Sequence, residues 1–132
     1  TPVAYREVKY CGILRQSWYV CQQSECPYAF NDLIHNPSFP NRTQILHAIG
    51  QFTARLYQRG VFHQDYSGGN ILFSADGSKI QLIDLNRIRF CHRAPLERGL
   101  QLFERLNIDR EALEIMGTAF AQSFFKLADV RI

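Results

Sequence analysis

The feature that most constrains the fold is a polar loop over residues 63–70, with the sequence His-Gln-Asp-Tyr-Ser-Gly-Gly-Asn. Residues 41–59, before the loop, predict a long helix, because apolar side chains recur every three to four positions and Gly60 follows as a helix end. Residues 71–83, after the loop, predict a β-hairpin around an Asp-Gly turn. Helix, loop and hairpin follow one another directly, and long helices do not alternate with strands along the chain. This order argues against a doubly wound parallel sheet.

The helix over 41–59 is expected to begin at a capping box and to bury one face. Asn41 is the expected N-cap, and Gln44 lies at the third helical position, from which its side chain can reach back to the cap. The expected buried face consists of Ile45, Ile49, Phe52 and Leu56.

Further elements are expected on both sides of this unit. Residues 3–10 and 17–22 have strand-like composition and predict an antiparallel pair separated by Gly12. The fold class is therefore α+β, mainly helical with short β-hairpins. The remaining expected elements are a polar linker over 22–27 and helices over 28–36, 95–106 and 109–127.

The bulk composition is that of one ordinary globular domain. The chain has 132 residues, of which 46% are hydrophobic and 20% charged. Its net charge of +3 is modest, and we expect no nucleic-acid partner. Twelve of the 15 basic residues are Arg, which suits bidentate contacts to phosphate or carboxylate and equally suits a plain exposed surface.

The four cysteines form no Cys-x-x-Cys pair, so we expect reduced, mostly buried thiols rather than disulfides or a zinc site. This usage, in a sequence with no signal peptide and no membrane-spanning stretch, predicts a cytoplasmic protein. The chain begins at Thr1 rather than Met, and we therefore expect an excised piece of a longer protein.

The polar loop and the end of the hairpin carry the residues best suited to chemistry. Asp65 and Asn70 belong to a His-x-Asp-x-x-x-x-Asn pattern, and Asp84 ends the second strand of the hairpin. Two carboxylates and an amide are the oxygen ligands that Mg²⁺ accepts beside phosphate oxygens and water. Each residue also has a structural reading: Asp65 as a loop cap, Asn70 as a left-handed turn residue, and Asp84 as a cap for the next turn.

The order of these residues is similar to the catalytic loop and magnesium-binding strand of protein-kinase-like phosphotransferases. The resemblance implies that Asp65 is the catalytic carboxylate, which orients an acceptor hydroxyl and takes its proton. It implies that Asn70 and Asp84 hold Mg²⁺, and that His63 supports the loop from below rather than reacting.

More closely, the chain resembles the lipopolysaccharide core kinases, which phosphorylate Kdo or heptose sugars and have a protein-kinase-like fold. The resemblance implies that residues 1–21 are the last two strands of the small lobe, 22–27 the hinge and 28–132 the large lobe. Gln22, Gln23 and Ser24 would then contact the adenine of ATP. The implied cofactors are ATP and Mg²⁺.

Several residues depart from the protein-kinase pattern. Ser67 stands where Ser/Thr protein kinases carry Lys, which suits the sugar-kinase branch, and Asn86 stands where they have Gly. The 132 residues contain no glycine-rich phosphate loop, and Lys9 is the only lysine before the hinge. We therefore expect the small lobe upstream of this chain, and we expect these residues alone to be weak or inactive catalysts.

Basic residues follow Asp84 closely, with only Glu97 opposing them. The cluster suits an anionic sugar or glycolipid substrate, or peripheral contact with an anionic inner-membrane surface, and it equally suits an exposed loop with local salt bridges. Its members are Arg87, Arg89, His92, Arg93 and Arg98, of which the three arginines at 87, 89 and 93 are the expected substrate contacts.

Two other functional readings share the same residues. The chain could be a pseudokinase-like binding module that uses the fold as a scaffold. It could also belong to a different kinase-like transferase, of the aminoglycoside or choline phosphotransferase type or a protein kinase.

Overall fold

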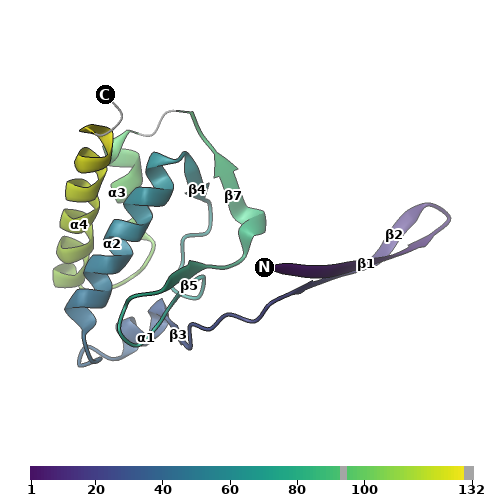
Figure 1. The fold of residues 1–132 in the computed structure, drawn as a ribbon, viewed down its shortest axis with the longest axis horizontal. Coiled ribbons are helices and arrows are strands. Elements are labelled where there is room, and N and C mark those ends of the chain that lie inside the picture. The colour runs from purple at the N-terminus through teal and green to yellow at the C-terminus, as the bar shows by residue number, and fades with distance from the viewer. Residues whose placement is uncertain (93–94, 130–132) are drawn as a thin grey trace.

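The computed structural model describes residues 1–92 and 95–129, which form a mixed α+β fold with four α-helices and small antiparallel sheets (Figure 1). The α+β class expected from the sequence is confirmed. The elements in chain order are β1 (Pro2–Tyr10), β2 (Ile13–Cys21), β3 (Tyr28–Ala29), α1 (Phe30–His35), α2 (Arg42–Gln58), β4 (Val61–His63), β5 (Ile71–Phe73), β6 (Ile80–Leu82), a 3-10 turn η1 (Leu85–Arg87), β7 (Ile88–Phe90), α3 (Leu96–Glu104) and α4 (Arg110–Asp129).

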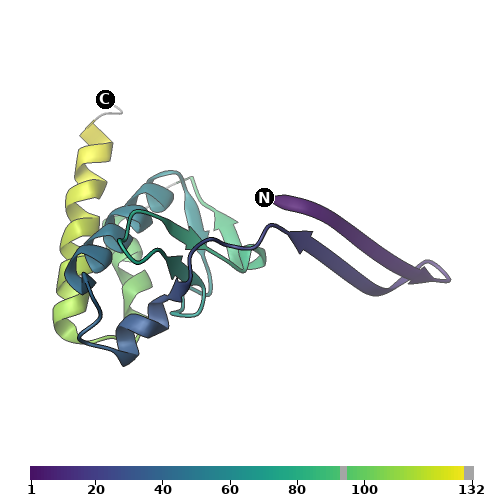
Figure 2. The same cartoon turned by 60° about the horizontal axis from the view of Figure 1, so that its bottom comes forward.

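Strands β1 and β2 form an antiparallel hairpin that extends away from the helical body (Figures 1 and 2). The pair was expected, but β2 begins four residues earlier than position 17. Cys11 and Gly12 both have positive φ, at 50° and 76°, so they form a two-residue turn and pairing resumes at once. Nearly every side chain of the hairpin is exposed, including Cys11 and Cys21. The expectation of mostly buried thiols is therefore wrong, although all four cysteines are free of disulfides.

The helical body is built around α2, which packs lengthwise against α4 (Figure 1). Gly50 permits this close approach, because a Cβ there would overlap the backbone oxygen of Met116. The buried face of α2 is rotated from the expected one, since Phe52 and Leu56 are only half-buried. The residues that α2 buries are Ile45, Leu46, Ile49, Gly50, Thr53, Ala54 and Tyr57.

Helix α2 begins without the expected capping box. Asn41 has a left-handed backbone, with φ 58° and ψ 25°, and its side chain makes no capping hydrogen bond. The start of the helix is anchored instead by Arg42, which donates to the carbonyl of Leu33 and pairs with Asp109 at 2.5 Å. These bonds fasten α2 to α1 and to the start of α4. The other end matches the expectation, because Gly60 has a φ of 76° and directly follows the cap residue.

The strands on either side of the loop, β4 and β5, belong to two small sheets. Strand β5 pairs with both β3 and β6, which confirms the hairpin over 71–83. Strand β4 pairs with β7, so His63 lies opposite Ile88. Strands β3, β4 and β7 were not expected; β3 takes Tyr28 and Ala29 from the predicted helix over 28–36, which is therefore shorter. The two later helices lie close to their expected positions.

Candidate active site

Tyr66 anchors the loop between β4 and β5 to helix α2. Its side chain is buried, and its hydroxyl shares a hydrogen bond with the hydroxyl of Thr53 on α2. Burial raises the pKa of the Tyr66 phenol well above its ordinary value, so the group stays neutral. Gly68 is buried against α1, where the backbone N–H of Asn31 donates to the Gly68 carbonyl at 3.2 Å. The loop is therefore bonded to both α2 and α1.

The imidazole of His63 joins the loop to the end of the hairpin. Its Nδ1 accepts the backbone N–H of Asp65 at 3.1 Å, so the ring proton belongs on Nε2. That Nε2 lies 3.1 Å from the carbonyl oxygen of Ile83 and 3.0 Å from that of Asp84. The ring is 3% exposed. One buried side chain thus bonds to the backbone of both candidate carboxylate residues.

Asn70 closes the loop onto Asp65. Its side-chain NH₂ donates to the Asp65 carbonyl at 3.0 Å and lies 3.4 Å from the Asp65 carboxylate. Its backbone carbonyl accepts the N–H of Ile83 at 2.9 Å, which ties the loop to the residue before Asp84. Because the NH₂ group is used within the loop, the amide oxygen of Asn70 is the atom left for a cation.

Asp84 stands at an exposed bend between the hairpin and η1. Its backbone is left-handed, with φ and ψ both 57°, a conformation that Asp tolerates better than most residues. Asp65, Asn70 and Asp84 provide two carboxylates and an amide, a donor set that fits Mg²⁺. In residues 1–92 and 95–129 no group of three or more His, Cys, Asp or Glu side chains is placed to hold a metal, so a metal site here depends on the amide.

A cleft of about 1000 Å³ runs from the segment after β2 to Asp84. Gln22, Gln23 and Ser24 line one wall of the cleft, and Phe52 with the end of β6 lines another. The backbone N–H of Gln22 is already bonded to the Thr1 carbonyl at 2.8 Å. Within the segment the Ser24 hydroxyl is also engaged, because it accepts the N–H of Cys26 at 3.0 Å and donates to the amide oxygen of Gln81.

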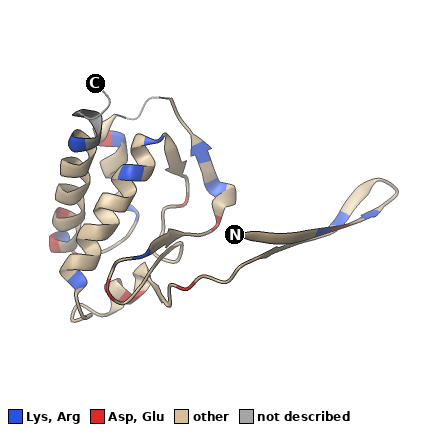
Figure 3. Ribbon diagram, in the orientation of Figure 1, with Lys and Arg blue, Asp and Glu red and all other residues tan. Residues whose placement is uncertain are grey.

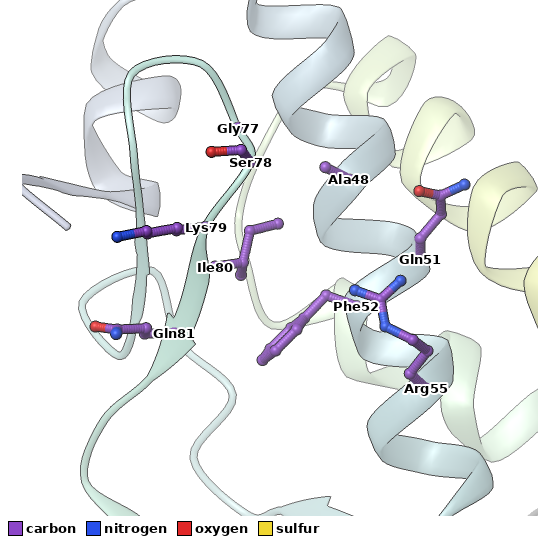
Figure 4. Close-up of a pocket in the computed structure, with 9 residues that line it drawn as sticks. All are labelled: Ala48, Gln51, Phe52, Arg55, Gly77, Ser78, Lys79, Ile80 and Gln81. Carbon is purple, nitrogen blue, oxygen red and sulfur yellow. The ribbon is translucent and has the colours of Figure 1, made fainter. Parts of the chain in front are cut away.

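A smaller hollow of about 500 Å³ lies between α2 and β6 and shares Phe52, Ile80 and Gln81 with the cleft. Phe52 and Ile80 point toward each other across it, whereas Lys79 points away from α2 (Figure 4). Lys79 pairs there with Glu25 at 2.6 Å. No sequence pattern indicated this hollow.

Of the basic residues after Asp84, Arg87 lies in η1, Arg89 in β7 and Arg98 in α3 (Figure 3). Arg87 and Arg89 are exposed, and none of the ion pairs between described residues involves either of them. Arg98 instead lies over the ring of Phe62, 4.9 Å from its centroid. Arg93 falls outside the described residues.

The anchors of the loop were missed by sequence reasoning. Thr53 and Tyr66 meet across 13 positions, and Arg105 donates to the carbonyl of Gln64 at 2.5 Å across 41. No local spacing signals such pairs. The only available sign was the polar Thr53 on the apolar side of a helix.

Of the three candidate residues Asp84 lines the larger cleft, and the comparison with protein families indicates a kinase. Residues 1–109 match the model of the lipopolysaccharide kinase (Kdo/WaaP) family, and the chain belongs to that family. No curated protein and no solved structure matches the chain. Across the described residues, no helix is both long and apolar enough to cross a membrane.

Proposed function

We propose that the chain is the core of an ATP- and Mg²⁺-dependent phosphotransferase that transfers phosphate to a sugar hydroxyl of the lipopolysaccharide core. Family membership supports a lipopolysaccharide kinase. The observation that carries the residue assignment is the His63 ring, which bonds to the backbone of both Asp65 and Asp84. Residues 28–132 would form the large lobe of a protein-kinase-like fold, and residues 1–21 the last two strands of its small lobe.

In this proposal Asp65 receives the proton of the acceptor hydroxyl. Asp65 is exposed at the top of the loop, and its carboxylate lies within reach of the Asn70 amide. That contact orients the carboxylate, and a positioned carboxylate of this kind contributes about 10²–10⁴-fold to the rate. Asn70 and Asp84 would hold Mg²⁺, which when bound neutralises charge on the phosphates.

The cleft supports a nucleotide site at the segment 22–24. Gln22 already donates its backbone N–H to Thr1, so a backbone donor to adenine would come from Gln23 or Ser24. The half-buried Phe52 supplies an apolar surface on another wall of the same cleft.

Arg87 and Arg89 would bind the anionic acceptor. They lie three and five residues after Asp84, and Phe90 beside them is 81% exposed. Arginines next to an exposed aromatic ring suit a phosphorylated glycolipid at an anionic surface. We therefore propose a cytoplasmic enzyme with peripheral contact to the inner membrane.

The test is ATP-dependent phosphorylation of lipopolysaccharide core acceptors by the full-length protein. Asp65→Ala and Asp84→Ala should each abolish transfer, whereas Glu104→Gln, which alters an exposed carboxyl on α3, should leave it unchanged. Transfer that survives both aspartate changes would refute the proposal. A thermal shift with Mg-ATP but no transfer to any acceptor would favour the pseudokinase reading. Transfer to an aminoglycoside, choline or a protein instead of the sugar would favour another kinase-like transferase.

A further inference from the structure

The peptide group between Gln64 and Asp65 is held at both ends by side chains. Its carbonyl accepts from the Arg105 guanidinium at 2.5 Å, and its N–H donates to His63 Nδ1 at 3.1 Å. A peptide group is planar, so bonds to its two opposite ends restrict the orientation of the whole plane. That plane sets the direction in which the Asp65 side chain leaves the backbone.

The end of α3 holds the loop on both sides of Asp65. Phe103, two positions before Arg105, packs edge-on against Tyr66 with ring centroids 6.3 Å apart. Both rings are buried, and Phe103 also packs against Phe120 at 5.6 Å. The base of the Arg105 side chain is therefore fixed relative to the loop. Residue 64 is bound by Arg105 and residue 66 by Phe103, and Asp65 lies between them.

The choice of partner for Arg105 is informative. A cation at the end of a helix ordinarily interacts with the last carbonyls of its own helix. Here the hydrogen bond of Arg105 instead crosses 41 positions to a loop carbonyl. A charged donor on a carbonyl polarises the peptide group and strengthens the hydrogen bond made by its N–H. The N–H of Gln64 itself donates to the Arg87 carbonyl at 2.7 Å, so Gln64 is held on a third side.

We propose that Arg105 is a positioning residue for the catalytic Asp65, acting through the Gln64–Asp65 peptide group. The inference rests on the proposed role of Asp65. It assigns to α3 a part in the reaction that no residue spacing indicated. Arg105 touches neither nucleotide nor acceptor in this proposal, so its loss should alter turnover rather than binding.

The test compares Arg105→Gln and Arg105→Lys in the full-length protein, with Arg110→Gln as the matched control. Arg110 is an exposed arginine whose partner is Glu114 on its own helix. Arg105→Gln should lower kcat roughly tenfold, with the KM for ATP and for the acceptor within about twofold, because misplacement of a catalytic group costs rate. Arg105→Lys, which keeps a charged donor, should recover part of kcat. Arg110→Gln should match the wild type.

A readout that needs no activity follows the Asp65 backbone amide by NMR. In Arg105→Gln its resonance should shift and its hydrogen exchange should accelerate, and in Arg110→Gln neither should change. Unchanged kcat together with an unchanged Asp65 amide would overturn the inference, and so would a raised KM at constant kcat. Asp65→Asn separates the two claims. If it transfers phosphate at the wild-type rate, the proposed function fails; if it is inactive while Arg105→Gln is normal, only the positioning role fails.

Discussion

Replacing His63 by Ala measures how much one buried ring contributes to the candidate site. Alanine removes the acceptor for the Asp65 N–H and the donor shared by the carbonyls of Ile83 and Asp84. Each lost hydrogen bond costs about 1 kcal/mol, more where a buried group is left without a partner. The cavity left by the ring adds a similar amount. We expect the free energy of unfolding to fall by about 2–4 kcal/mol.

Urea denaturation of the full-length protein is the assay, and the midpoint should fall by roughly 1–2 M. His47→Ala is the matched control, because His47 is exposed on α2 and its loss should cost under about 0.5 kcal/mol. His63→Asn places a polar atom near Nδ1 and His63→Gln places one near Nε2, so each should recover part of the loss. Equal stability of His63→Ala and His47→Ala would refute the view that this ring joins the loop to the hairpin.

Three further predictions follow from packing and burial. Gly68→Ala should lower the thermal midpoint only slightly, because the Cβ overlaps the end of the exposed Asn31 side chain, which can move aside. Gly69→Ala meets only one atom, at 3.9 Å, and should be tolerated; a large loss of stability in either variant would contradict this. Gly50→Ala should lower the free energy of unfolding in urea by about 1–3 kcal/mol, because its Cβ would force α2 away from α4. Gly117→Ala, with its nearest atom at 3.8 Å, should be neutral or stabilising, and the reverse order would count against the packing of α2 on α4. Burial raises the pKa of Tyr66 above its ordinary 10.0, so above about pH 10 the unfolded chain loses this proton first and the free energy of unfolding falls as pH rises. The loss of stability at alkaline pH should therefore be shallower in Tyr66→Phe, and an identical curve would exclude this cause.

Elements of the fold were predictable where the sequence carries a strong local signal. The helix over 41–59 and the hairpin over 71–83 were predicted because helical spacing, Gly60 and the turn residues act within a few positions of each other. Strands β3 and β7 were not predicted, because two or three residues become a strand only when a distant partner lies beside them. The cap at Asn41 was predicted wrongly: its backbone is left-handed, and the start of α2 is bonded to α1 and to Asp109 through the Arg42 side chain.

The candidate site, too, was predictable from the sequence only in part. The pattern from His63 to Asn70, with Asp84 after the hairpin, located the residues that the His63 ring brings together. What the sequence could not predict is the support, since Thr53 and Arg105 reach the loop from elements whose packing is decided by the whole core. The orientation of α2 was also out of reach, because Phe52 faces the cleft rather than the core.

The most direct test of the central claim is a paired measurement on Asp65→Asn in the full-length protein: kcat for phosphate transfer, and the affinity for Mg-ATP. Asparagine keeps the size of the side chain and cannot accept the acceptor proton. If Asp65 is the base, kcat should fall by about 10²–10⁴-fold while the affinity for Mg-ATP stays within about threefold. Transfer at the wild-type rate would contradict the account.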